Sequence, residues 1–361
     1  MKWTDIRTGY SCNQQCRFCD QGDARSRVVD ADTGAVAATL ERLSHRDGVV
    51  LAGGEVTLRA DLPSLIQTAK SLGYKRVAVQ TNGRILASKG AALHLREQGL
   101  TDVVLALHAP DAHMHDWLTA TPGSFRQAIS GARASVAAGL RLRITTVVCR
   151  SNMPLLSGMV RVAHELGATS QHFTLCREEG GAAAEARMLV PRFSLAGPAI
   201  VAALDLARLL VVDADVVGLP LCFLGNHRAT AGDRLDVVQP DRVGAVPGVA
   251  PARASRYLAP CAGCRLRPAC RGVDAHYADR YGDEELLPQG VPLPAKSDVV
   301  RLELFDAAGP LSTRLLRQAL VKLRAKGIAQ LEMVGDHPDI GIIHKEAERL
   351  GFLAPPSSLQ G

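Results

Sequence analysis

Aromatic residues, long apolar runs and blocks of one charge are all scarce in this sequence. Phe, Trp and Tyr together make up 4% of the 361 residues, and the formal charge is +6, from 42 basic and 36 acidic residues. We find no polybasic block, and no window that approaches the roughly 20 apolar residues of a membrane span. Because RNA recognition relies on aromatic stacking and basic grooves, the composition argues against nucleic acid as a partner.

A signal peptide is also lacking, since the stretch MKWTDIRTGYS at the N-terminus has no apolar core. We therefore expect a cytoplasmic protein with no membrane partner. Thiols stay reduced in that compartment, so clustered cysteines are better explained as metal or redox ligands than as disulfide partners. A chain with 47% hydrophobic residues is long enough to bury one large domain and a smaller one without disulfides.

Short β-branched segments alternate with amphipathic helical segments over the first two-thirds of the chain. The predicted strands are residues 2–9, 48–53, 76–83, 102–109, 142–149 and 170–175. The predicted helices are residues 33–44, 62–73, 89–99, 124–139 and 153–167. This alternation predicts parallel strands joined by crossover helices, and hence an α/β fold that is a βα barrel or part of one.

Chemistry-bearing motifs follow each of the first four predicted strands. They are SCNQQCRFCDQ (residues 11–21), GGE (53–55), TNG (81–83) and HAPDAHMHD (108–116). The active site of a βα barrel lies at the C-terminal ends of its strands. We therefore expect all four motifs to face the same mouth.

The first motif places Cys12, Cys16 and Cys19 in the spacing Cys-x3-Cys-x2-Cys, with no fourth cysteine or histidine close by. Thiolates hold iron-sulfur clusters, and a 4Fe-4S cluster ordinarily takes four of them. Three local thiolates leave one iron open to another ligand, and an open coordination position is typical of catalytic metal sites. A structural zinc site completed by a distant cysteine is the alternative.

The triplet followed by GGE resembles the radical S-adenosylmethionine (radical SAM) superfamily. In that superfamily a Cys-x3-Cys-x-aromatic-Cys motif after the first strand binds a 4Fe-4S cluster, and the aromatic residue here is Phe18. The resemblance covers roughly residues 2–220 and implies a partial (βα)6 TIM-like barrel. It implies that the three cysteines hold the cluster and that the amine and carboxylate of S-adenosylmethionine chelate the fourth iron.

The same resemblance implies a set of residues around S-adenosylmethionine. They are Phe18, Gly53, Gly54, Glu55, Thr81, Asn82 and Asn152. Phe18 is expected near the adenine, and the two glycines let backbone carbonyls approach the methionine ammonium, to which Glu55 adds a charge-assisted hydrogen bond. Many relatives have a serine near the ribose where this chain has Ala106, so the ribose contacts are left unassigned.

The implied activity is reductive cleavage of S-adenosylmethionine by one electron from the cluster. It yields a 5'-deoxyadenosyl radical that abstracts hydrogen from a substrate. The implied electron donor is a flavodoxin-like or ferredoxin-like protein. The resemblance does not identify the substrate, the bond that is made, or whether S-adenosylmethionine is consumed or regenerated.

A second group of cysteines lies in the C-terminal half. Cys261, Cys264 and Cys270 have the spacing Cys-x2-Cys-x5-Cys, and Cys222 precedes them. The group resembles the SPASM and twitch extensions of some radical SAM enzymes, which implies one auxiliary 4Fe-4S cluster held by all four thiolates. Structural zinc is the alternative ligand. The isolated Cys149 and Cys176 are most simply buried small hydrophobes.

The histidine-rich motif at residues 108–116 is expected to be a loop at the mouth. Its order His-x4-His-x-His has no standard ligand geometry, so we favour a structural or substrate-facing role over metal binding or acid-base chemistry. His108 is the exception of interest, because it continues the fourth strand and is placed to point into the barrel.

We predict three units: a partial barrel over residues 1–215, an auxiliary-cluster region over 216–290, and a small βαβα appendage over 296–361. The appendage consists of strands at 299–306 and 329–336 and helices at 312–327 and 339–352. The first of these helices is basic, which indicates a solvated face or a docking surface.

Three function classes compete. A radical SAM enzyme that acts on a peptide or a small metabolite leads, because auxiliary clusters recur among peptide maturases and dehydrogenases of the superfamily. A radical SAM enzyme that modifies RNA, and a non-catalytic iron-sulfur or zinc protein, are the alternatives. We recognise no leader-binding segment before the cysteine triplet, so a peptide substrate is expected to be delivered by a partner or by the appendage.

Overall fold

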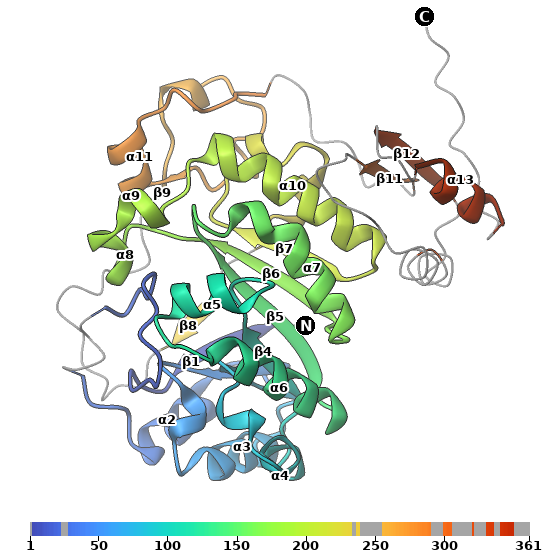
Figure 1. Ribbon diagram of the computed structural model, residues 1–361. Coiled ribbons are helices and arrows are strands. Elements are labelled where there is room, and N and C mark those ends of the chain that lie inside the picture. Colours follow the sequence, from blue (N-terminus) through green and yellow to red (C-terminus); the bar gives the residue numbers. More distant parts are fainter. Residues whose placement is uncertain are drawn as a thin grey trace, which may run out of the picture.

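A computed structural model describes residues 2–22, 28–232, 236–238, 255–289, 299–304, 320, 330–335 and 340–349. Its body is an eight-stranded parallel sheet in the order β7-β6-β5-β4-β3-β2-β1-β8 (Figure 1). The strands are β1 (Trp3–Arg7), β2 (Gly48–Ala52), β3 (Arg76–Thr81), β4 (Asp102–Ala106), β5 (Arg141–Val148), β6 (Ser170–Leu175), β7 (Asp213–Val217) and β8 (Asp236–Val238).

Helices follow the strands, and most of them cover one face of the sheet. They are α2 (Thr33–Arg42), α3 (Leu62–Ser71), α4 (Ala91–Glu97), α5 (Ala112–Thr119), α6 (Ser124–Ala137), α7 (Leu156–Glu165), α8 (Gly181–Ala184), α9 (Ala186–Leu189) and α10 (Phe193–Leu209). Single 3₁₀ turns lie at Val56–Leu58, Ile85–Ala87, Met153–Leu155, Leu221–Phe223, Gly225–Thr230 and Ala259–Cys261.

The sheet is strongly curled. The Arg143 guanidinium on β5 lies 5.0 Å from the centroid of the Trp3 ring on β1. These strands are four steps apart in the sheet, about 19 Å if it were flat at ~4.8 Å per step. Side chains this far apart in strand order can meet only across a concave surface, so the sheet forms an open partial barrel. We call this concave surface the inner face.

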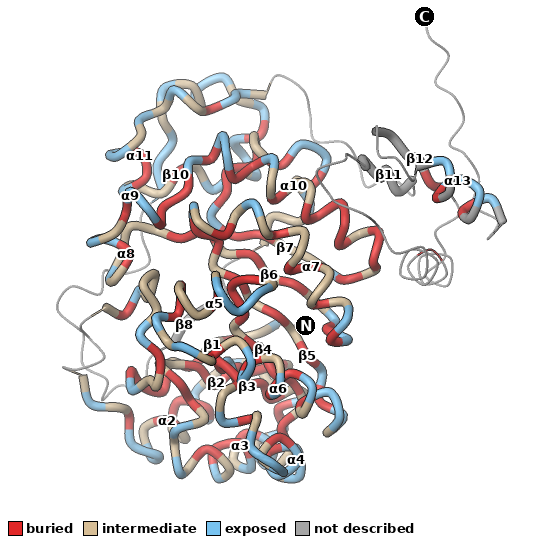
Figure 2. The backbone as a smooth tube through the Cα atoms, in the orientation of Figure 1, coloured by how far each residue is buried: buried red, intermediate tan, exposed pale blue. Residues whose placement is uncertain are grey.

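The main core lies between the outer face of the sheet and the helices. Side chains such as Ile6, Leu51, Val79, Leu105 and Ile144 are fully buried there (Figure 2). On β1, β5 and β6, buried residues alternate with half-exposed ones, as the period-two geometry of a strand requires. The buried set packs on the helices and the half-exposed set lies on the inner face.

All six predicted strands and the five predicted helices are present, which confirms the partial TIM-like barrel. Two short strands were not predicted. β7 pairs with β6 at one edge, and β8 pairs with β1 at the other. The sheet is therefore wider than the six strand-helix repeats indicate.

The prediction of a loop over residues 108–116 was wrong from Ala112 onward, where α5 begins. Asp111 caps this helix by accepting a hydrogen bond from the Met114 N–H at 2.9 Å. Asp116 accepts bonds from the N–H groups of Gly123 and Phe125 at 2.6 and 2.8 Å. Both carboxylates thus have structural roles, in line with the structural or substrate-facing role that we favoured for this motif.

The prediction that no window approaches a membrane span also needs correction. Within the described residues, the stretch Ala186–Leu209 is long and apolar enough to cross a membrane by length and composition alone. It comprises α9 and α10, and most of it is buried inside the protein (Figure 2). A core helix of a soluble protein passes the same test, and α10 packs in the same hydrophobic core as β6 and β7.

The C-terminal part adds two smaller sheets. The antiparallel pair β9 (Ser255–Arg256) and β10 (Val273–Asp274) encloses three cysteines and leads into α11 (Ala275–Tyr281). In the appendage, β11 (Val299–Leu304) and β12 (Gln330–Gly335) are parallel and α13 (Ile340–Arg349) follows. The basic helix predicted at 312–327 lies outside the described residues, apart from the helical and buried Leu320.

Leu51 and Leu195 offer a matched test of where the core lies. Leu51 in β2 is fully buried, whereas Leu195 in α10 is 50% exposed. We expect Leu51→Ala to lower the free energy of unfolding by about 2–5 kcal/mol, because it leaves a cavity beneath the helices. Leu195→Ala should change it by less than about 0.5 kcal/mol. Urea unfolding followed by circular dichroism measures both, and equal effects would contradict this description of the core.

Candidate functional site

The three cysteines of the first motif lie on a loop that follows β1, residues 8–22, which we call the cysteine loop. Backbone hydrogen bonds fix its start, since Thr8 N–H donates to Ala52 O at 2.7 Å and Tyr10 N–H donates to Asp30 Oδ1 at 2.6 Å. The N–H of Gln15 donates to Thr119 O at 3.2 Å. The loop is therefore held by strand β2 and by the end of α5, at the C-terminal edge of the sheet.

Arg17 secures the middle of the loop. Its guanidinium donates to Trp117 O at 3.1 Å and to Glu185 Oε1 at 3.0 Å, and lies 4.7 Å from the centroid of the Trp117 ring. Cation-π stacking and a two-oxygen carboxylate contact together give an arginine a single orientation. The cysteine loop is thus tied both to α5 and to the segment before α9.

Cys12, Cys16 and Cys19 are all half-exposed on this loop, and none of the nine cysteines is in a disulfide. The N–H of Cys19 donates to Cys16 O at 3.1 Å, which folds the Cys16–Cys19 stretch into a tight turn. Three soft thiolate donors on one anchored loop, reachable from solvent, suit an iron-sulfur cluster. Within the described residues, no three Cys, His, Asp or Glu side chains are grouped closely enough for a single metal ion.

Gly53 and Gly54 allow the second motif to pack against the cysteine loop. A Cβ on Gly54 would lie 2.2 Å from Ser11 O, and one on Gly53, whose φ is +156°, would lie 2.7 Å from Gly9 O. Any larger residue would push the two segments apart. Glycine is therefore required at both positions for packing, in addition to the predicted approach of their carbonyls to a ligand. The Gly53 carbonyl also accepts from Gln21 Nε2 at 3.1 Å.

Glu55 is buried and joins the second motif to the third. Its Oε1 accepts hydrogen bonds from the hydroxyls of Thr57 at 2.5 Å and Thr81 at 2.6 Å, and its Oε2 accepts from the Asn82 N–H at 2.7 Å. A buried carboxylate that accepts three or more bonds holds its donors in fixed positions. GGE and TNG therefore form one hydrogen-bonded unit.

Asn82 connects this unit to the cysteine loop. Its Nδ2 donates to Asn13 Oδ1 at 2.7 Å, and Asn13 lies between Cys12 and Cys16. The neighbouring Arg84 guanidinium donates to the Asn13 carbonyl. The three motifs after β1, β2 and β3 therefore meet at one place, as the sequence predicted.

Phe18 packs edge-on against His108, with 4.6 Å between the ring centroids. His108 lies just past β4, and its Nδ1 accepts from the Val147 N–H at 3.2 Å, so the neutral ring carries its proton on Nε2. Burial, together with the neighbouring His115, holds the pKa of His108 well below its usual value. The fourth motif thus reaches the cysteine loop through His108.

The side chain of Asn152, a candidate cofactor contact by its position in the sequence, is engaged by backbone groups. It is almost fully buried, and its Oδ1 accepts from the Cys149 N–H at 2.7 Å. Its Nδ2 donates to His108 O at 2.7 Å and to Val147 O at 2.9 Å. All the polar groups of the amide are used by backbone, so Asn152 ties the end of β5 to the end of β4.

Cys149 and Cys176 are both buried, as predicted, and lie side by side. They follow the paired positions Val148 and Leu175 on β5 and β6, and the Cys176 N–H donates to Val148 O at 2.9 Å. Burial raises the pKa of the Cys149 thiol, and the adjacent Cys176 raises it further. The Cys149 thiol is therefore kept neutral.

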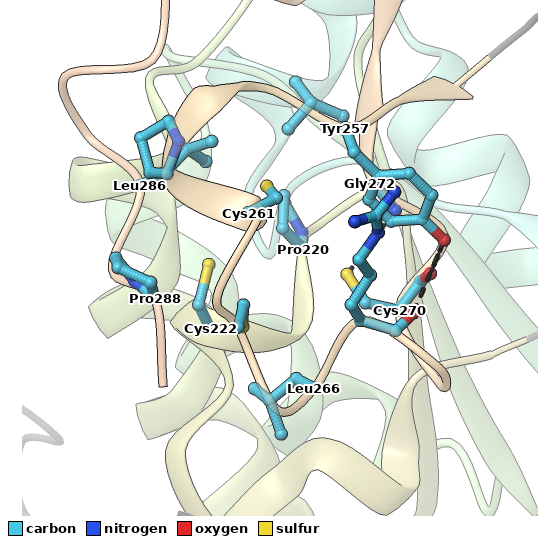
Figure 3. Close-up of a pocket in the computed structure, with 13 residues that line it drawn as sticks. Pro220, Cys222, Tyr257, Cys261, Leu266, Cys270, Gly272, Leu286 and Pro288 are labelled. Carbon is cyan, nitrogen blue, oxygen red and sulfur yellow. Dashed lines mark hydrogen bonds between the residues drawn. The ribbon is translucent and has the colours of Figure 1, made fainter. Parts of the chain in front are cut away.

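The second group of cysteines lines one pocket. Cys222, Cys261, Cys264 and Cys270 all contribute to its wall, which is otherwise mostly apolar (Figure 3). Three come from the β9–β10 loop, and Cys222 lies in the 3₁₀ turn after β7. Cysteines far apart in the sequence thus line the same pocket.

Backbone N–H groups point at the sulfur atoms of this pocket. Gly272 donates to Cys270 Sγ and Gln289 donates to Cys264 Sγ, each at 3.4 Å. The backbone of Leu287 also hydrogen-bonds Cys222 and lowers the pKa of its thiol, although burial raises that pKa overall. Hydrogen bonds to sulfur stabilise thiolates and help to set the potential of iron-sulfur clusters.

A bridging segment, residues 177–190, contacts the cysteine loop and α11, the helix that follows the β9–β10 loop. The N–H of Gly181 donates to Cys19 O at 2.9 Å, and Gly180 packs so closely there that a Cβ would lie 2.3 Å from the same oxygen. At the other end, Glu178 forms an ion pair with Arg280 of α11. Sequence analysis did not predict this segment, because its function depends on contacts with residues far along the chain.

Charged residues on the inner face were also missed. Asp5, Arg143 and His172 lie on β1, β5 and β6, and Asp5 interacts electrostatically with both of the others. The signal was available in the sequence, because WTDIR, RLRITTVV and SQHFTL alternate polar with apolar residues.

Comparison with known proteins gives matches over the first half of the chain. The family model of the radical SAM superfamily matches residues 6–158. An AdoMet-dependent heme synthase of Oleidesulfovibrio alaskensis is 29% identical over 48% of this chain and 45% of its own length. A probable GTP 3',8-cyclase of Sulfurisphaera tokodaii is 32% identical over 45% of this chain and 51% of its own. The chain spans about half the length of the curated relatives it matches.

Solved structures give weaker likenesses. Methylornithine synthase (PylB) has a TM-score of 0.49 at 15% identity, with 67% of this chain and 72% of that chain covered. Streptococcus suis SuiB has a TM-score of 0.48 at 17% identity, with 59% and 48% covered. The sequence matches carry the assignment: residues 6–158 form a radical SAM domain.

Proposed function

We propose that the protein binds a 4Fe-4S cluster through Cys12, Cys16 and Cys19 and cleaves S-adenosylmethionine reductively. The observation that carries this proposal is the convergence of three motifs: Glu55 binds the TNG segment, and Asn82 binds the cysteine loop. When bound, the cluster and S-adenosylmethionine supply a 5'-deoxyadenosyl radical that abstracts a hydrogen atom from the substrate.

The residues around the cysteine loop have separate tasks in this proposal. Arg17 and the backbone bonds to the end of α5 hold the three thiols in one orientation. The Glu55 network holds the ends of β2 and β3 at a fixed distance, so the polar groups of GGE and TNG are arranged before S-adenosylmethionine arrives. Phe18, fixed against His108, offers an aromatic face for the adenine.

We assign the second pocket to one auxiliary 4Fe-4S cluster held by Cys222, Cys261, Cys264 and Cys270. The shared pocket and the N–H donors directed at three of the sulfur atoms support this assignment. In this position the cluster would exchange electrons with a substrate radical. The bridging segment connects the cysteine loop to α11, the helix that follows the β9–β10 loop.

The proposed substrate is a peptide or a small molecule, and the proposed electron donor is a flavodoxin-like or ferredoxin-like protein. SuiB has been crystallised with its precursor peptide SuiA, whereas other relatives are named for a heme and for GTP. We place the protein in the cytoplasm, where the absence of disulfides among its nine cysteines is the ordinary condition.

The first prediction concerns the iron content. We expect the anaerobically reconstituted protein to hold about eight irons, and the Cys12→Ala, Cys16→Ala, Cys19→Ala variant about four. Dithionite and S-adenosylmethionine should give 5'-deoxyadenosine with the wild-type protein only. Metal analysis and chromatography measure both quantities. Zinc in place of iron, with no 5'-deoxyadenosine from the wild type, would overturn the proposal.

The second prediction separates the two cysteine sites. Cys264→Ala should reduce the iron content from about eight to about four while the electron paramagnetic resonance signal that responds to S-adenosylmethionine remains. Cys149→Ala is the matched control, since Cys149 is buried away from the auxiliary pocket, and it should keep the full iron content. Loss of iron that is equal in both variants would argue against an auxiliary cluster in this pocket.

The third prediction tests the Glu55 network. Glu55→Gln replaces an acceptor oxygen by an NH2 group beside donors from Thr81 and Asn82, so the TNG segment should shift. We expect S-adenosylmethionine to bind at least about tenfold more weakly, as measured by equilibrium dialysis. Glu97→Gln on the exposed face of α4 is the control. Unchanged affinity in Glu55→Gln would show that the network does not organise the cofactor site.

A further inference from the structure

The inner face of the sheet carries charged groups that the cysteine loop does not use. Its residues on the three alternating strands are Trp3, Asp5, Arg7, Arg141, Arg143, Thr145, Val147, Ser170, His172 and Thr174. In a closed βα barrel this face is filled by branched apolar side chains. Here most of the side chains are polar and none is fully buried, so this face is available to a ligand.

Arg143 is oriented and feels the charge of Asp5, but it is hydrogen-bonded to no acidic group among the described residues. Its guanidinium is stacked on the Trp3 ring at 5.0 Å, and it forms no hydrogen bond or ion pair with any other described residue. Stacking fixes the plane of the group and leaves its N–H donors unused. Such a guanidinium is suited to bind a carboxylate through two parallel hydrogen bonds.

Asp5 is an acidic side chain that also lacks a hydrogen-bonded partner in the part of the chain that the structure describes. Its Oδ1 is buried without a hydrogen-bond partner among the described residues, and no described group donates to the other oxygen. Burial raises the pKa of Asp5 to about 6, although Arg143, His172 and Arg7 lower it. A desolvated carboxylate without a bonded partner is destabilising, and a donor from a bound molecule would relieve it.

His172 lies between these charges and the C-terminal edge of the sheet. Its Nδ1 contacts a carboxylate oxygen of Asp215 on β7, and its Nε2 lies 2.8 Å from the hydroxyl of Thr174. Both ring nitrogens are therefore engaged and the ring is held in place. The polar surface continues in this way from the middle of the sheet toward the strand ends, where the cysteine loop lies.

We propose that the inner face binds a small zwitterion, with its carboxylate on Arg143 and its ammonium group on Asp5. One molecule of this kind would satisfy both charged side chains at once, which a purely anionic or purely cationic ligand would not do. On the neighbouring strands β2 and β3, the small residues Ala52 and Ala78 are buried in a cluster against which Trp3 packs. The inference deepens the proposed function and rests on it, because it treats the bound zwitterion as the substrate.

Isothermal titration calorimetry of the iron-loaded protein with each of the twenty L-amino acids, and with guanosine, tests this assignment. We expect binding of at least one amino acid, and binding at least about tenfold weaker for its N-acetyl carboxamide, which lacks both charges. Asp5→Asn and Arg143→Gln should each weaken binding of the amino acid by at least about tenfold. Arg133→Gln, an exposed change on α6, is the matched control and should bind as the wild type does.

Loss of binding must not come from unfolding. Asp5→Asn removes a buried charge that has no bonded partner, so its melting temperature should equal or exceed that of the wild type. No binding of any zwitterion, or equal binding by Asp5→Asn, Arg143→Gln and the wild type, would overturn the inference. So would binding of guanosine in preference to the amino acids.

The same samples distinguish this inference from the proposed function. A wild-type protein that forms 5'-deoxyadenosine but binds no zwitterion would overturn the inference alone. A wild-type protein that binds a zwitterion through Asp5 and Arg143 but never forms 5'-deoxyadenosine would overturn the proposed function, and with it the assignment of the zwitterion as substrate.

Discussion

The Glu55 carboxylate is the contact on which the candidate site depends. It is buried, and it accepts hydrogen bonds from Thr57, Thr81 and Asn82, which lie on segments after two different strands. Asn82 then donates to Asn13 within the cysteine loop. A buried carboxylate is stable only when its acceptor positions are filled, so this group draws the ends of β2 and β3 together and, through Asn82, positions the loop after β1. The hydrogen bonds of the buried Glu55 carboxylate thus hold the three motifs of the site together.

The curl of the sheet gives its two faces different chemistry. The outer face is fully buried beneath the helices, and the inner face carries polar side chains on β1, β5 and β6. The contact of Arg143 with Trp3 spans the concave side and shows that side chains of β5 and β1 meet across it. In an open barrel the interior does not have to be filled by the chain itself, so charged groups can remain there for a ligand.

Local patterns predicted the six strands and five of the helices because each buries one face against the same core. They also predicted which motifs would meet, since parallel strands end at one edge. Contacts across the sheet were beyond such patterns. The side chain of Asn152 hydrogen-bonds to backbone groups at the ends of two strands. The Arg143 guanidinium stacks on Trp3, which lies four strands away. Neither contact can be recognised from the residues next to it in the sequence. The start of α5 at Ala112 could have been predicted locally, because Asp111 is a capping residue.

The anchors of the cysteine loop lie far along the chain, and this has a consequence for biosynthesis. Residues 12–19 leave the ribosome early, but their loop is fixed by Thr119, Gly181 and Glu185, which are made much later. The segment that carries Gly181 is itself tied to Arg280. Chains fold from the N-terminus as they are synthesised, so the strand β1 can form while the loop beside it is still unsupported. The cysteine loop therefore acquires its last support only after Arg280 has been made.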